Sequence, residues 1–150
     1  MLYYVQGDAT HPVGDGPKII AHVVNDVGVW GAGFVLALSK RWPDLKEIYR
    51  EYHQKTLGSV QFVFVEDDIL VANMCAQHGL GRHTKPIRYD ALRRCLMIVN
   101  ERAESIGATI HGPRFGAGLA GGDWETIESI IQEVCTVPVY IYDLPRRDRG

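Results

Sequence analysis

The stretch KIIAHVVNDVGVWGAGFVLAL, residues 18–38, decides the fold. Residues 18–25 are apolar almost throughout and rich in β-branched side chains, a pattern typical of a strand buried on both faces. A glycine-rich loop follows at 26–33, and residues 34–42 then have the spacing of a helix. A buried strand that leads through a glycine loop into a helix indicates an α/β sheet whose ligands lie beyond the carboxyl ends of the strands.

Strand-like and helix-like segments alternate along the rest of the chain. Glu66 and Asp67 separate two apolar runs and predict a hairpin there. The expected strands are 2–6, 60–65, 68–75, 108–113 and 137–144, and the further expected helices are 44–56, 88–107 and 123–135. We therefore expect one α/β domain over residues 1–145, with a mixed, largely parallel central sheet covered on both faces. Residues 146–150 are expected to form a mobile basic tail.

Composition limits the classes of function. The chain has 150 residues and a net charge of −2, and this near balance argues against a dedicated nucleic-acid surface, which normally carries a strong basic excess. The cysteines Cys75, Cys95 and Cys135 lie far apart without metal-ligand spacing, so we expect reduced thiols in an intracellular protein and no bound metal. The N-terminus lacks the pattern of a signal peptide and no apolar run is long enough to span a bilayer, so we expect a cytoplasmic protein without a membrane partner.

A second glycine-rich segment, RFGAGLAGGDW (114–124), follows the strand expected at 108–113. Both glycine segments place bare backbone N–H groups just before a helix, where these donors and the helix dipole favour an anion. Neither segment matches the dinucleotide fingerprint or a Walker loop. One such loop is as consistent with a tight turn as with a binding site. Two loops with the same GAG core favour a cradle for a diphosphate.

Six short motifs occur in order along the chain: QGDAT (6–10), AHVVN (21–25), WGAGFVLAL (30–38), NMCAQ (73–77), PRFGAGLAGGDW (113–124) and VYIYDL (139–144). In that order they resemble the successive motifs of macrodomains, nearly end to end. The resemblance is strongest to the branch that contains ADP-ribose-1''-phosphate phosphatase and terminal ADP-ribose protein glycohydrolase. It implies a three-layer α/β/α fold that binds ADP-ribose or an ADP-ribose derivative without a cofactor. ADP-ribosylated protein or nucleic acid is a further partner that the resemblance suggests.

The resemblance also implies the roles of individual residues. Asp8 would accept a hydrogen bond from the adenine amino group, and the ring of Tyr142 would cover the adenine. Asn25 and Gln77 would face the distal ribose, and Trp30 would form either a lid over that ribose or a surface anchor, with the lid preferred. The two glycine loops would close over the diphosphate and the distal ribose from opposite sides. The remaining ligand-binding residues expected from the family motifs are Gly7, Ala9, Gly31, Ala32, Gly33, Phe34, Pro113, Arg114, Phe115, Gly116, Ala117, Gly118 and Leu119.

The chain departs from the family's glycohydrolases at two positions. Those relatives use a lysine after the middle strand and an aspartate directly after the second glycine loop, where this chain has Gln77 and Ala120. Glutamine has no nucleophilic amine, so a covalent lysine adduct is not expected. Asp123 is the acid that remains, either as a base or nucleophile toward a terminal phosphate or only as the N-cap of the last helix. Among the histidines we favour His78 as its catalytic partner, whereas His22, inside an apolar strand, reads as a core residue.

Three functions stay open at this point. The first is a hydrolase that removes the terminal phosphate from ADP-ribose-1''-phosphate. The second is a non-catalytic reader of ADP-ribose or of ADP-ribosylated macromolecules. The third is a hydrolase that removes ADP-ribose from protein or nucleic-acid ends without a lysine adduct.

Overall fold

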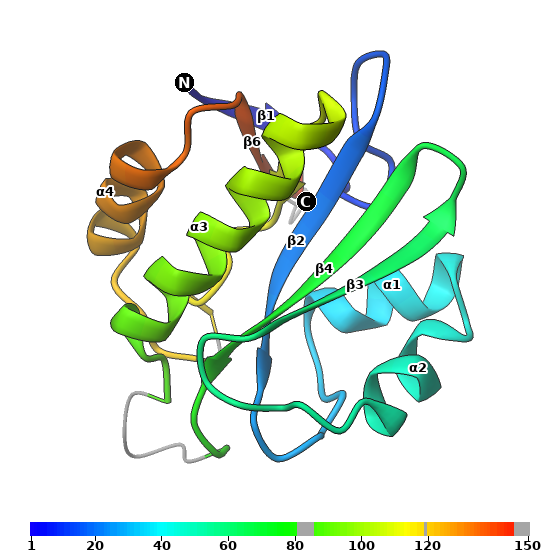
Figure 1. Ribbon diagram of the computed structural model, residues 1–150, viewed down its shortest axis with the longest axis vertical. Helices are drawn as coiled ribbons and strands as arrows, with labels where there is room; N and C mark the ends of the chain where they lie inside the picture. The colour runs from blue at the N-terminus through cyan, green and yellow to red at the C-terminus, as the bar shows by residue number, and fades with distance from the viewer. Residues whose placement is uncertain (81–85, 119, 146–150) are drawn as a thin grey trace, which may run out of the picture.

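A six-stranded mixed sheet forms the centre of the protein (Figure 1). The computed structural model describes residues 1–80, 86–118 and 120–145, so the predictions for Leu119 and for the tail at 146–150 lie outside the described residues. In chain order the elements are β1 (Leu2–Gln6), β2 (Lys18–Asn25), α1 (Phe34–Arg41), α2 (Leu45–Glu51), β3 (Val60–Glu66), β4 (Ile69–Gln77), α3 (Tyr89–Ile106), β5 (Thr109–Gly112), α4 (Trp124–Val134) and β6 (Val139–Asp143). Each expected strand and helix has a counterpart within two residues of the expected bounds, except that α2 ends at Glu51 instead of continuing to residue 56.

The strand order is β1-β6-β5-β2-β4-β3. All neighbouring strands are parallel except β3 and β4, which form the expected antiparallel hairpin. The prediction of a mixed, largely parallel sheet is therefore confirmed. Because β1, β2, β4, β5 and β6 all run in one direction, their carboxyl ends meet at the same edge of the sheet.

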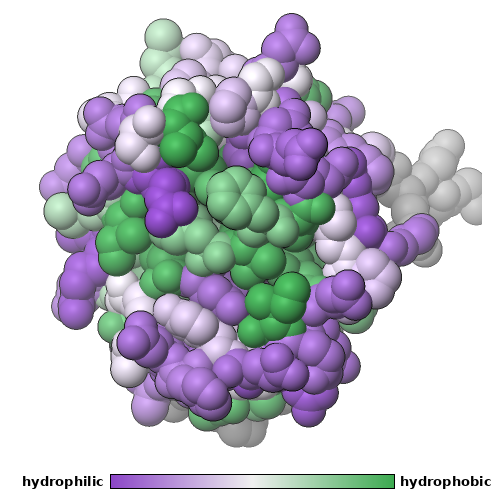
Figure 2. Space-filling view, turned by 45° about the vertical axis from the view of Figure 1, so that its right-hand side comes forward, coloured by the Kyte–Doolittle hydropathy of each residue, from purple (hydrophilic) through white to green (hydrophobic). Residues whose placement is uncertain are grey.

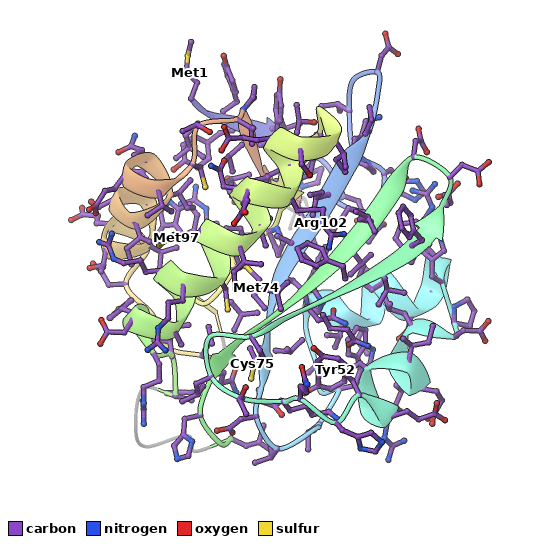
Figure 3. All side chains as sticks on the ribbon, in the orientation of Figure 1. Met1, Tyr52, Met74, Cys75, Met97 and Arg102 are labelled. Atoms are coloured by element: carbon purple, nitrogen blue, oxygen red, sulfur yellow. The ribbon has the colours of Figure 1, made fainter. Side chains whose placement is uncertain are left out.

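Helices cover both faces of the sheet and complete three layers. Along β4 the side chains alternate between two cores: Met74 packs with α3 and α4, whereas its neighbour Cys75 packs with α1 and α2 (Figure 3). The strands β2 and β4 are buried along almost their whole length, which explains their continuous apolar sequence. The three-layer α/β/α arrangement expected from the resemblance is confirmed.

The strand β3 forms one edge of the sheet and is partly exposed. Its Phe64 is 72% exposed, and Phe62 is covered by the guanidinium of Arg102, which lies 4.3 Å from the ring centroid. Figure 2 views the molecule from this side and shows apolar side chains gathered at its centre, with polar side chains around them. Such an edge keeps an unpaired row of backbone groups that the sheet does not use.

The second glycine loop folds back on itself after β5. The backbone N–H of Gly122 donates to the carbonyl of Gly116 at 2.8 Å, which brings the two ends of the loop into contact. A Cβ at position 122 would lie 2.4 Å from that carbonyl oxygen and 2.9 Å from Cδ1 of Ile127. Gly116 itself has a φ of 82°, and a Cβ there would lie 2.9 Å from Ile87. The glycines of this segment therefore allow close backbone packing as well as exposure.

We expect Gly122→Ala to destabilise the fold by about 1–3 kcal/mol, because the new methyl group meets backbone that cannot give way. Urea unfolding followed by circular dichroism measures the change. Gly118→Ala is the matched control in the same loop, since a Cβ there meets nothing within 4 Å. Equal losses of stability in the two variants would contradict the packing argument.

Candidate functional site

A cleft with two lobes opens at the edge of the sheet where the parallel strands end. One lobe, of about 440 Å³, lies between the two glycine loops, and we call it the glycine lobe. The other, of about 830 Å³, lies over the ends of β1 and β6 and includes Tyr142, and we call it the tyrosine lobe. Gly33, Phe34, Pro113 and Arg114 line both lobes, and we call these four residues the waist.

Most of the residues expected to bind ligand lie around this cleft. The waist includes four of them, two from each glycine loop region. The glycine lobe adds Asn25, Gly31, Ala32, Gln77, Phe115, Gly116 and Gly118, and the tyrosine lobe adds Gly7, Ala9, Asp8 and Tyr142. Residues that are more than 100 positions apart in the chain thus line one continuous surface.

The helix α1 begins at the waist without a capping side chain. Gly33 is its N-cap residue, with a φ of 81°, and the first turn of α1 contains no acidic residue. The N–H of Leu36 donates to the carbonyl of Gly33 at 3.0 Å, so the N–H groups of Phe34 and Val35, together with the helix dipole, are available to an anion. This is the physical basis for placing a phosphate group at the waist.

In the tyrosine lobe, Asp8 is held by its own loop. Its Oδ1 accepts hydrogen bonds from the backbone N–H of Thr10 at 2.9 Å and from the Thr10 hydroxyl at 2.8 Å. Within the described part of the chain, no donor reaches the second oxygen, Oδ2. The carboxylate is half-buried and lines the lobe, so one oxygen remains for a ligand that carries a donor.

Tyr142 on β6 connects the same loop to the sheet. Its hydroxyl accepts a hydrogen bond from the backbone N–H of Val13 at 2.9 Å and lies 2.7 Å from Nδ1 of His111. Burial lowers the pKa of His111 to about 4, so the ring is neutral at pH 7 and one of its nitrogens donates while the other accepts. Its Nε2 lies 2.6 Å from the Thr109 hydroxyl, which is the partner of the second ring nitrogen. The ring of Tyr142 is thereby fixed in the wall of the lobe.

In the glycine lobe, Asn25 supports the first loop. Its Oδ1 accepts from the backbone N–H of Val29 at 3.0 Å and of Val27 at 3.2 Å, and its Nδ2 donates to the Val29 carbonyl at 2.7 Å. The hydroxyl of Tyr49 donates to the Asn25 carbonyl at 2.8 Å. Asn25 lines the lobe, but its amide is used to hold the turn at 26–29.

His22 is buried, as its sequence context predicts for a core residue, and it also lies at the base of the glycine lobe. It is 2% exposed and belongs to the lining of the lobe. Its Nε2 bonds to Oδ1 of Asn73, whose Nδ2 donates to Gln61 at 3.0 Å. Since Asn73 Oδ1 is an acceptor, Nε2 carries the proton, and burial lowers the pKa of His22 to about 4. The ring is therefore neutral at pH 7, with its lone pair on Nδ1.

The cross-strand register explains this row of polar groups. His22 on β2 is aligned with Asn73 on β4, and Asn73 is aligned with Gln61 on β3. Away from the strand ends, each of these three strands has a single polar residue among apolar ones, and this is the sequence signal that could have identified the row.

The two residues proposed for catalysis do not line the cleft. Asp123 is exposed, and its Oδ2 accepts from the backbone N–H of Thr126 at 3.1 Å and from the Thr126 hydroxyl at 2.8 Å, which makes it the N-cap of α4. The side chain of His78 is 60% exposed and its Nδ1 lies 2.7 Å from Oδ2 of Asp26. Of the alternatives left open by the sequence, the geometry gives Asp123 the role of a helix cap.

Trp30 lies in the core instead of over the cleft. It is 7% exposed, its Nε1 donates to the hydroxyl of Ser39 at 2.8 Å, and its ring packs against Tyr49 with the centroids 5.3 Å apart. A lid would need an aromatic ring at the surface of the lobe. The indole of Trp30 is instead buried between α1, α2 and the sheet, so it does not form the expected lid. Ala117 similarly packs against the core and is not part of the cleft lining.

The sequence analysis missed several residues that line the tyrosine lobe. They are Thr10, His11, Ala37, Lys40, Arg41, Asp143 and Leu144. Lys40 and Arg41 form the basic last turn of α1. Arg41 donates to the carbonyl of Thr10 and pairs with Glu66 at 2.9 Å, so it links α1 to the loop that holds Asp8.

Among residues 1–80, 86–118 and 120–145, no group of three or more His, Cys, Asp or Glu residues could hold a metal ion. None of the helices in these ranges is long and apolar enough to cross a membrane.

Comparisons with known proteins identify relatives along the whole chain. No protein-family model matches. A solved structure of a macrodomain protein from Streptomyces coelicolor is 47% identical, with a TM-score of 0.84, over 95% of this chain and 99% of that one. The ADP-ribose 1''-phosphate phosphatase of Candida albicans is 28% identical over 95% of this chain and 99% of its own length. The mouse Chromodomain-helicase-DNA-binding protein 1-like is 31% identical over 97% of this chain, which spans only 18% of that relative.

We expect Asp123→Ala to destabilise the protein by about 1 kcal/mol, because the first turn of α4 loses its capping acceptor. Asp123→Asn retains an oxygen at the capping position and is the matched control, with little expected loss. Urea unfolding measures both variants. If alanine and asparagine at position 123 gave the same stability as the wild type, the capping role would be excluded.

Proposed function

The chain belongs to the macrodomain family, and we propose from this that its two-lobed cleft binds ADP-ribose. The observation that carries the proposal is the waist, where uncapped backbone N–H groups of α1 lie between two lobes of unequal size. ADP-ribose has the matching layout, with a nucleoside and a second ribose joined by a diphosphate. A chain of net charge −2 can hold such a ligand, because backbone donors and a helix dipole serve the diphosphate without a lysine or a metal.

In this proposal the tyrosine lobe takes the adenosine. The free Oδ2 of Asp8 accepts a hydrogen bond from the exocyclic amino group of adenine, while Oδ1 stays bonded to Thr10. The Tyr142 ring offers an aromatic face to the base, and such stacking is worth about 1–3 kcal/mol in nucleic-acid binders. The hydrogen bonds of Tyr142 to Val13 and His111 support this role, because they hold the ring in place before the ligand arrives.

The glycine lobe takes the distal ribose. Gln77 lines this lobe, and its Nε2 donates to the carbonyl of Gly79 at 3.1 Å, which leaves its carbonyl oxygen for a ribose hydroxyl. Asn25 acts through the loop that it holds. The glycine residues of both loops allow the backbone to approach the sugar and the diphosphate closely.

We expect Asp8→Asn to weaken ADP-ribose binding about 10-fold or more, because a charged acceptor for the adenine amino group is lost. Isothermal titration calorimetry measures the dissociation constant. Asp15→Asn is the matched control, since Asp15 is exposed in the same loop and does not line the lobe. If Asp8→Asn binds ADP-ribose as tightly as the wild type, the proposed hydrogen bond between Asp8 and adenine is excluded.

Hydrolysis of ADP-ribose-1''-phosphate is the second candidate function. It is supported by the similarity to the ADP-ribose 1''-phosphate phosphatase of Candida albicans, which extends over almost the whole length of both chains. Of the side chains described in the glycine lobe, His22 and Arg114 are the titratable ones, and His22 is neutral with a lone pair on Nδ1. Water would attack the phosphorus, the bond between phosphorus and the ribose oxygen would break, and His22 would take the proton from the water. The ribose oxygen would leave with a proton from solvent, which gives inorganic phosphate and ADP-ribose.

We expect the wild type to release phosphate from ADP-ribose-1''-phosphate, and His22→Ala to lose about 100-fold or more of that rate. His78→Ala should keep the rate, because that side chain pairs with Asp26 outside the cleft. Phosphate release is followed by a colorimetric assay, and circular dichroism checks that both variants are folded.

The same assay separates the other functions. If the wild type binds ADP-ribose but releases no phosphate, the protein is a non-catalytic reader of ADP-ribose. Release of ADP-ribose from a modified protein or oligonucleotide, but not of phosphate, would identify a hydrolase of such macromolecules. Loss of phosphate release in His78→Ala would restore the role that the sequence suggested for that histidine.

A further inference from the structure

Arg114 is the waist residue whose side chain makes the most specific contacts. Its Nε donates to Oδ1 of Asp143 at 2.8 Å, and its Nη2 donates to Oδ2 of the same carboxylate at 3.0 Å. Such a two-point pair fixes direction as well as distance, which a single hydrogen bond does not. The side chains are each 42% exposed, so the pair contributes little to the free energy of folding. Its main effect is to fix the orientation of the two side chains.

Two aromatic rings hold the same guanidinium from other elements. Its carbon lies 5.1 Å from the ring centroid of Tyr4 on β1 and 5.1 Å from that of Trp124 on α4. These rings are joined to each other, since Nε1 of Trp124 donates to the Tyr4 hydroxyl at 2.9 Å. The Trp124 ring also meets Phe115, a wall residue of the glycine lobe, edge to face at 6.4 Å. Arg114 is therefore fixed by β1, α4 and β6 together.

These contacts join parts of the cleft that belong to different lobes. Arg114 stands at the start of the second glycine loop, which lines the glycine lobe, while Asp143 lines the tyrosine lobe. The hydrogen bonds from Arg114 lower the pKa of Asp143, so the pair is charged at neutral pH. On the opposite side of the waist, Gly33 and Phe34 reach both lobes as consecutive residues of one turn. On the Arg114 side, the consecutive residues Pro113 and Arg114 also reach both lobes, and the Arg114 side chain adds a link from this segment to Asp143 at the end of β6.

We infer that Arg114 is a positioning residue that couples the two lobes by fixing the second glycine loop against the end of β6. The inference rests on the proposed binding of ADP-ribose. A ligand that spans both lobes gains affinity only if their relative placement is fixed in advance. A ligand that fills the tyrosine lobe alone gains nothing from that placement. Coupling therefore appears as the affinity advantage of ADP-ribose over AMP.

The test compares these two ligands in Arg114→Lys by isothermal titration calorimetry. Lysine keeps the positive charge but loses the planar fork and its stacking. We expect the advantage of ADP-ribose over AMP to fall about 10-fold. Asp143→Asn should lower the advantage by a similar factor, and the double variant should lose little more, because both changes break one connection. Arg93→Lys is the matched control, since Arg93 pairs with Glu133 at 2.6 Å and lines neither lobe.

The possible outcomes have distinct meanings. Equal weakening of ADP-ribose and AMP in Arg114→Lys would show a general structural role and overturn the inference. An unchanged ratio in this variant, with normal wild-type binding, would overturn the inference and leave the proposed function intact. A wild type that does not bind ADP-ribose would overturn both.

Discussion

The parallel pairing of β2 with its two neighbours is the constraint on which the rest of the structure depends. Lys18 at the start of β2 is aligned with Ile69 of β4 on one side and with Thr109 of β5 on the other. Parallel strands need crossover helices, so this pairing produces the helical layers on both faces. It also brings the segments that follow β2, β4 and β5 to one edge. The cleft is thus a consequence of strand direction, and the loops supply its chemistry.

Much of this could be predicted from the sequence because the informative signals are local. Continuous apolar runs identified β2 and β4, glycine clusters identified the loops, and alternation of elements identified a largely parallel sheet. The order of six motifs then indicated which loops share one site. Most residues expected from these motifs do line the cleft, from Gly7 near the N-terminus to Tyr142 in the last strand.

The predictions that the sequence could not resolve concern side-chain partners. Trp30 lies in the first glycine loop, yet its indole is buried in the core, where Nε1 donates to Ser39 of α1. His78 follows the middle strand, yet its imidazole pairs with Asp26 from another loop. The position of His22 depends on the registers of three strands, which no single segment encodes. For His78 and His22 the decisive contact joins segments that are far apart in the chain and are brought together by the sheet.

The pairing of β1 with β6 has a consequence for the order in which the protein acquires its site during synthesis. The first strand lies at the edge of the sheet, and its neighbour there is the last strand. During synthesis, Tyr3 and Tyr4 of β1 therefore have no strand to pair with until residues 139–143 have left the ribosome. The segments of the glycine lobe are complete by residue 120, whereas the tyrosine lobe needs residues 142–144. The residues of the two lobes are thus synthesised at different times. A chain that stalled before β6 would contain the residues of the glycine lobe but not all those of the tyrosine lobe.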